Sequence, residues 1–269
     1  MVETPTGVRW LLRLVTVGYL FLLVAWPVSL VVRHTFADGL AAPLRALADP
    51  VVTDALRLTA EVALSAVVIN LVFGVGIALL LVRYTFPGKR LLSVLVDVPL
   101  SVSPVVVGLA LLLVYNSRDG WFGTALAGAG IQVVFATPAM VMATVFVALP
   151  LVIREVVPVL QEIGDDQEQA ARSLGAGAAQ TFRRVTLPSI KWAVVYGVVL
   201  SLARSLGEFG AVKIVSGNVV QQTQTATLVV EQKYQNFEQG AAYTTSFVLA
   251  FASVVCIVIV SVLRPKESS

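Results

Sequence analysis

This sequence has little charge, one cysteine and one histidine. Charged residues make up 13% of its 269 residues, whereas a soluble domain carries about 25%. The lone Cys256 excludes an intrachain disulfide, and His34 has no partners of the kind that a metal centre requires. Neither a G-x-x-x-x-G-K-[ST] loop nor a Rossmann glycine fingerprint occurs, so any nucleotide chemistry must come from another protein.

What the chain has in excess is apolar sequence, 57% of its residues. Crossing the hydrocarbon core of a bilayer takes about 20 apolar residues in a helix. Six stretches approach or exceed that length, at 15–32, 62–82, 98–115, 131–153, 192–212 and 241–263, and only the one at 192–212 contains charge. We predict an all-α membrane protein with about six transmembrane helices in one domain, residues 1–269. The first stretch is longer than a secretory signal core, so we expect it to be retained.

The basic residues predict the orientation of these helices. Lysine and arginine accumulate in cytoplasmic loops. With the N-terminus inside, twelve of the 19 basic residues fall in inside segments and six in outside loops, and Arg204 lies in the membrane. This distribution favours cytoplasmic placement of both termini.

The longest inside loop, at 154–191, carries signals for two short helices. A Gly-Asp-Asp turn at 164–166 precedes a helix-forming segment at 167–174, which Gly175 would end. A second helical piece follows and would be stopped or kinked at Pro188. Spacing alone leaves two interpretations open, a helix that fits a groove on a partner protein or an amphipathic helix at the lipid surface.

Within this loop, QAARSLG at 169–175 and, nine residues later, VTLP at 185–188 resemble the "EAA" loop of ABC-importer permeases, E-A-A-x-x-x-G-x(9)-I-x-L-P. In that family the loop is the coupling helix, which docks on the ATP-binding subunit. The resemblance places a cytoplasmic coupling-helix loop at 159–191. The positions that it assigns to ATPase coupling are Glu168, Gln169, Ala170, Ala171, Arg172, Ser173, Leu174 and Gly175. Gln169 replaces the family glutamate, and Glu168 could take over its charged contact.

Two further segments, 97–108 and 204–218, resemble the sulfate/molybdate branch of these permeases, and 120–123 with 207–217 is most similar to the W-type sulfate/thiosulfate permeases. The resemblance covers most of the chain. It implies a type I importer fold in the cell (plasma or inner) membrane. The partners it implies are a T-type permease, two ATPase subunits and an extracytoplasmic sulfate-binding protein, without nucleic acid. It also implies a non-catalytic subunit without a cofactor of its own, because ATP and Mg²⁺ bind the partner ATPase.

Two groups of residues are candidates for the translocation pathway. Arg204 and Glu208 are four residues apart and share one face of the fifth stretch. An arginine at the centre of a span costs about 2.5–3.5 kcal/mol, so the pair either clamps helices together or lowers the barrier for an oxyanion. The segment PLSVSPVVVG at 99–108 either only kinks its helix or lines the pathway with bent backbone. The predicted pathway residues are Ser101, Ser103, Pro104, Arg204, Ser205, Gly207, Glu208 and Phe209.

The function that the resemblance implies is the permease subunit of an ATP-driven importer of sulfate or thiosulfate. A permease for molybdate or tungstate is the main alternative, because tetrahedral dianions of similar charge could use the same pathway. An ATPase-independent secondary transporter fits less well, since such proteins often carry inverted repeats and no convincing repeat is found here. A membrane enzyme would need more than one Arg–Glu pair.

Overall fold

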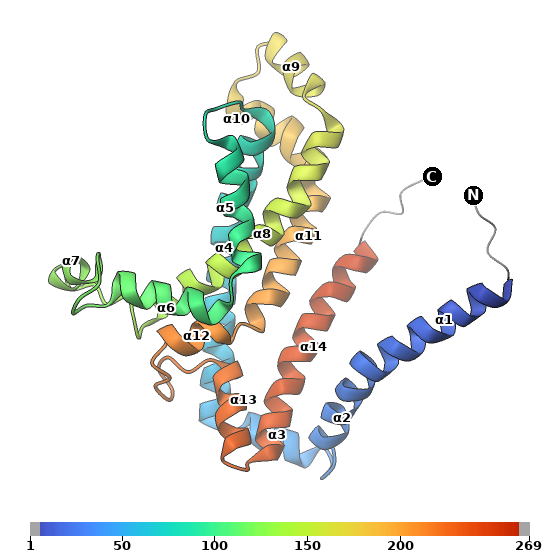
Figure 1. Cartoon of the computed structure of the whole chain (residues 1–269), viewed down its shortest axis with the longest axis vertical. Coiled ribbons are helices and arrows are strands. Elements are labelled where there is room, and N and C mark those ends of the chain that lie inside the picture. Colours follow the sequence, from blue (N-terminus) through green and yellow to red (C-terminus); the bar gives the residue numbers. More distant parts are fainter. Residues whose placement is uncertain (1–5, 264–269) are drawn as a thin grey trace.

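The computed structural model describes residues 6–263, and every regular element in that range is helical (Figure 1). The first half comprises α1 (Thr6–Leu20), the π-helical turn η1 (Phe21–Ala25), α2 (Trp26–Thr35), α3 (Ala41–Leu47), α4 (Pro50–Arg83), α5 (Lys89–Ser101), α6 (Pro104–Tyr115) and α7 (Gly123–Gly128). The second half comprises α8 (Thr137–Ile163), α9 (Asp166–Ser173), α10 (Ala178–Thr181), the π-helical turn η2 (Phe182–Thr186), α11 (Leu187–Leu206), α12 (Gly210–Val215), α13 (Ala226–Gln235) and α14 (Gln239–Leu263).

Five helical runs in the described residues are long and apolar enough to cross a membrane, and a bent pair of helices brings the number to six. The all-α membrane prediction is therefore confirmed. The orientation of the two termini is not tested by the structure and stays a prediction. Arg264 and Lys266, two of the basic residues that favoured a cytoplasmic C-terminus, lie outside the described residues.

The centre of the molecule is a bundle of α4, α8 and α11. Lipid is as apolar as a leucine side chain, so membrane helices associate closely where small residues let their backbones approach. Val152 of α8 lies between two such positions. A Cβ atom on Gly74 of α4 would be 2.8 Å from the Cγ1 of Val152, and one on Gly197 of α11 would be 2.9 Å from its Cα. These two glycines let α4 and α11 both approach α8 closely at Val152, and α4 and α11 also contact each other.

Two predicted spans are interrupted where the sequence suggested single crossings. The stretch at 98–115 is broken at residues 102–103, where α5 and α6 meet at 113°. The stretch at 192–212 stays helical only to Leu206 and resumes as α12 at Gly210. The two interruptions pack together, because a Cβ on Gly108 of α6 would lie 2.8 Å from the carbonyl oxygen of Ala211 and one on Gly210 would lie 3.2 Å from the Cβ of Pro104. Figure 1 shows α6 and α7 pointing sideways from the bundle as a result.

The N-terminal run from α1 to α2 slants away from the bundle (Figure 1). It contacts the rest of the chain near its C-terminal end, where His34 stacks on Tyr243 and Phe36 meets Phe247 edge-on, with ring centroids 5.1 and 5.4 Å apart. Most of its apolar side chains are exposed. In a membrane, lipid or another subunit would cover them.

The end of the bundle opposite α9 is closed by a charged clamp. Lys233 of α13 donates to Asp49, the residue that caps α4, at 3.1 Å and to Glu238 at 2.7 Å. Burial alone would raise the pKa of the Asp49 carboxyl, but the N–H of Val51 and the Lys233 ammonium outweigh it and hold that pKa below its usual value. The clamp ties α4 to the turn between α13 and α14.

The glycines of α4 allow a matched test of this packing. Replacing Gly74 by leucine forces a side chain into Val152, and we expect a loss of about 1–3 kcal/mol in stability from overpacking. Replacing Gly76 by leucine should change little, because no atom lies within 4 Å of its Cβ position. The thermal stability of both variants is measured as the midpoint temperature at which detergent-solubilised protein stops being monodisperse. Equal midpoints for the two variants would contradict the proposed contact.

Candidate coupling helix and translocation pathway

Helix α9 lies at one extremity of the molecule, beyond the ends of α4 and α8 (Figure 1). The predicted turn and helix are both confirmed: α9 starts after Gly164 and ends before Gly175, where the backbone is left-handed at φ 87°. Such a conformation is readily adopted only by glycine. Most of the QAARSLG segment is exposed, and the Leu174 side chain is 89% exposed.

The second helix of the loop does not end at Pro188. Residues 178–206 form one continuous helical run through α10, η2 and α11. Proline removes a backbone donor and its ring crowds the preceding turn. The wider π-helical turn at Phe182–Thr186 lies directly before Pro188 and accommodates both effects. The second arm of the loop is therefore a direct extension of a membrane helix.

Glu168 is the one buried residue of α9. Its carboxylate accepts from Arg83 at the end of α4, at 3.1 and 3.3 Å, and from the hydroxyl of Thr186 in η2, at 2.9 Å. Arg172, one turn further along α9, lies 3.7 Å from the same carboxylate. The Arg83 and Glu168 side chains are only 11% and 7% exposed. This placement does not support an outward charged contact for Glu168, because its carboxylate is occupied inside the chain.

Arg83 also satisfies the end of α8. Its guanidinium donates to the carbonyl of Leu160 at 3.0 Å and to that of Gly164 at 2.6 Å. The last carbonyls of a helix lack partners within the helix, and a cation is favourable there. One side chain thus joins α4, α8 and α9, and Glu168 extends the connection to η2. Sequence analysis missed Arg83, which precedes Glu168 by 85 positions.

The second predicted site lies at the interruption between α11 and α12. Arg204 and Glu208 form the expected pair, with Nη1 and Oε2 2.8 Å apart. The Glu208 side chain is 2% exposed and that of Arg204 is 37% exposed. The other carboxylate oxygen of Glu208 accepts from the N–H of Ala211 at 3.0 Å, and the hydroxyl of Thr227 donates to its backbone carbonyl at 2.8 Å. Glu208 therefore holds the interruption together and partly balances Arg204.

The remaining pathway candidates are distributed unevenly. Pro104 is brought against Gly210, next to Phe209, but Ser101 and Ser103 are exposed, and in residues 6–263 no hydrogen bond connects either serine to Arg204. Ser205 is buried, and its hydroxyl donates to the carbonyl of Ser201 at 2.7 Å. Gly207 is exposed at the interruption, and its N–H bonds the carbonyl of Ser205. The hydroxyl of Ser205 and the backbone N–H of Gly207, both predicted to lie in the pathway, are therefore used for hydrogen bonds within the chain.

A buried asparagine was missed by the sequence analysis. Asn70 of α4 is fully buried and donates to the hydroxyl of Ser201 at 3.2 Å. Its side-chain oxygen has no hydrogen-bond partner in the described structure. A polar side chain within an otherwise apolar span is the signal that could have found it.

Comparisons with known proteins agree on one class. The family model described as "Binding-protein-dependent transport system inner membrane component" matches residues 70–266. The chain is 44% identical over 248 residues to the sulfate transport system permease protein CysW of Synechococcus elongatus, covering 92% of this chain and 86% of that protein. It is 35% identical to the sulfate transport system permease protein CysT of Salmonella typhimurium, covering 92% and 89%. A bacterial ABC transporter involved in alginate import has a similar fold, with a TM-score of 0.79 at 13% identity and coverage of 98% and 96%.

The buried ion pair generates a prediction about α9. Replacing Arg83 by glutamine leaves the Glu168 carboxylate buried without its cation. We expect the free energy of unfolding to fall by about 3–5 kcal/mol and α9 to be displaced. Trypsin cleavage after Arg172 should accelerate accordingly. The matched control is Arg57→Gln, since its pair with Glu61 is 81% and 54% exposed and should contribute about 1 kcal/mol or less. Unchanged cleavage in Arg83→Gln would show that the pair does not hold the helix.

Proposed function

We propose, from the premise that this chain belongs to the family of binding-protein-dependent transport system inner membrane components, that it is the W-type permease subunit of an ATP-driven importer of sulfate or thiosulfate. The family places it among multi-pass inner membrane proteins, as the sequence resemblance implied. The substrate rests on the names of its relatives, above all the 44% identical CysW protein. A permease subunit forms a pathway and carries out no chemical step of its own.

The observation that carries the mechanism is the division of α9 into two faces. Glu168 is buried and attached to α4, whereas Gln169, Arg172 and Leu174 are exposed. In the proposal, α9 lies in the cytoplasm and its exposed face docks on an ATPase subunit. A cavity of about 250 Å³ beside it, lined by Leu174, Gly175, Thr181 and others, would receive a side chain of that subunit.

Force would then reach the membrane through the Arg83–Glu168 pair. ATP and Mg²⁺ bound by two partner ATPases would bring those subunits together and push α9. Because Arg83 holds α4, α8 and α9, and Glu168 holds η2, the displacement would be passed to three of the membrane helices at once. The permease pair would change from inward-facing to outward-facing, and a homologous T-type permease would supply the other half of the pathway.

Arg204 is the residue that we propose to face the transported anion. Its side chain is partly exposed, so part of the guanidinium is accessible, and the Glu208 carboxylate partly neutralises its charge. A weakly attractive site suits a transporter, because the ion has to leave as well as enter. High affinity would instead come from a separate extracytoplasmic sulfate-binding protein.

Docking through α9 can be tested with a matched pair of exposed side chains. Leu174→Glu places a charge on the proposed ATPase contact, and we expect at least about a tenfold loss of ATPase co-purification, as for an interface hot spot. Phe237→Glu should have no such effect, because Phe237 is similarly exposed at 87% but lies beyond α13 at the other end of the molecule. Equal co-purification of both variants would argue against docking at α9.

The substrate can be tested by competition. Cells that produce the complete importer should take up radiolabelled sulfate, and unlabelled sulfate or thiosulfate should suppress that uptake more than molybdate does. Uptake should stop when the ATPase is deleted. Stronger suppression by molybdate would favour the alternative substrate class, and uptake without the ATPase would favour a secondary transporter.

A further inference from the structure

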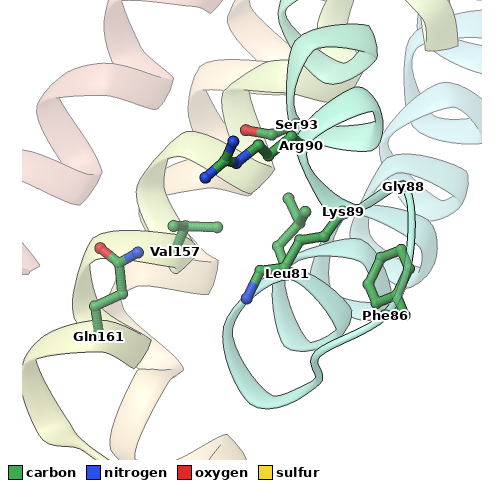
Figure 2. A pocket seen from close by; sticks show the side chains of 8 residues that line it. All are labelled: Leu81, Phe86, Gly88, Lys89, Arg90, Ser93, Val157 and Gln161. Carbon is green, nitrogen blue, oxygen red and sulfur yellow. The ribbon is translucent and has the colours of Figure 1, made fainter.

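A second concentration of positive charge lies far along the chain from Arg204, where α4 ends and α5 begins. The turn between these helices and the facing side of α8 line a cavity of about 590 Å³ that is open to the surface. Figure 2 shows the ammonium of Lys89, the guanidinium of Arg90 and the amide of Gln161 around this space. The Ser93 hydroxyl lies beside Arg90.

The charges in this cavity have no counterion among the described residues. Arg90 has no ion-pair partner among residues 6–263, and Lys89 donates one hydrogen bond, to the carbonyl of Tyr84 at 3.2 Å. Within the part of the chain that the structure describes, no acidic residue lines the cavity or occupies the first turn of α5. In an adjoining cavity, Asp97 is already paired with Arg154, with Oδ1 and Nη2 2.9 Å apart. Two cations therefore face one space, and no carboxylate from the described ranges neutralises them.

We propose that this cavity is a binding site for a tetrahedral oxyanion. A guanidinium and an ammonium form their strongest hydrogen bonds with charged oxygens, and a hydroxyl and an amide can add neutral donors. The first residues of α5 line the cavity, so the positive end of that helix dipole lies beside it. The cavity is larger than a bare ion, so the oxyanion would keep part of its hydration or carry a bulkier group.

Two sources supply this chemistry. A free sulfate ion leaving the pathway would meet these cations near the same end of the molecule as α9, and the phosphate of an anionic lipid would meet them at the membrane surface. The inference rests on the proposed function only for its choice of sulfate as a probe. Sulfate uptake and binding in this cavity are measured separately, so the failure of one is distinguishable from the failure of the other.

The test uses the full-length chain with its partner permease and ATPase subunits, without the extracytoplasmic binding protein, in two kinds of lipid nanodisc, so that sulfate held by the binding protein does not contribute. In phosphatidylcholine alone, equilibrium binding of radiolabelled sulfate is measured at constant ionic strength. In mixed phosphatidylcholine and phosphatidylglycerol, the phosphatidylglycerol retained after a detergent wash is measured by mass spectrometry. We expect Lys89→Gln with Arg90→Gln to lower one of these two quantities about tenfold, the effect of losing a charge-assisted contact.

Two controls separate the site from general effects. Arg118→Gln removes an exposed charge that does not line the cavity and should leave both quantities unchanged. Arg90→Lys alone keeps the charge and should retain most of the binding that the double variant loses. ATPase co-purification checks that each variant assembles. Loss in the sulfate arm identifies the free ion, and loss in the lipid arm identifies the headgroup. Binding by the double variant equal to that of the wild type in both arms would overturn the proposal.

Discussion

The ion pair between Arg83 and Glu168 determines where α9 can lie. Removing two charges from water is expensive, and buried pairs of this kind often contribute little net stability. What a guanidinium provides is direction, because its donors form a rigid planar fork. Here that fork is shared between the Glu168 carboxylate and two carbonyls at the end of α8. An apolar contact could slide, whereas this arrangement fixes α4, α8, α9 and η2 in one orientation.

The interruptions in α5–α6 and α11–α12 obey a different constraint. A lipid-exposed backbone needs its hydrogen bonds satisfied by the protein itself. At one interruption the Glu208 carboxylate accepts from the N–H of Ala211 and the Thr227 hydroxyl donates to the carbonyl of Glu208. Gly108 and Gly210 let the other interruption pack against it. The bundle thus combines one end held rigid by Arg83 with a layer of broken helices that contains Arg204. In the proposal, a movement imposed on α9 would be carried through α4, α8 and α11 to the layer of broken helices.

Hydropathy predicted the helices because the apolar length of a span is a local property of the sequence. It could not predict the 113° turn between α5 and α6, since a run of apolar residues has no direction and Pro99 and Pro104 only indicated that the backbone was irregular. The turn and helix of the loop at 154–191 were placed correctly, whereas its coupling role, which the motif implied, stays a prediction. The inward role of Glu168 was missed, because its partner Arg83 lies 85 positions away and no local pattern connects them.

Arg204 and the cavity at Lys89 and Arg90 differ in whether a carboxylate neutralises their positive charge, and this difference affects how tightly each would hold an anion. Arg204 is paired with a nearly buried carboxylate, whereas Arg90 has no acidic partner among residues 6–263. Charges in low-dielectric surroundings act more strongly than charges near water. An uncompensated arginine within the membrane would therefore hold a dianion too tightly, whereas two uncompensated cations near the proposed cytoplasmic surface are weakened by solvent and salt. In the proposed pathway the ion would therefore meet only weak attraction at both places, because Glu208 compensates Arg204 and water screens Lys89 and Arg90.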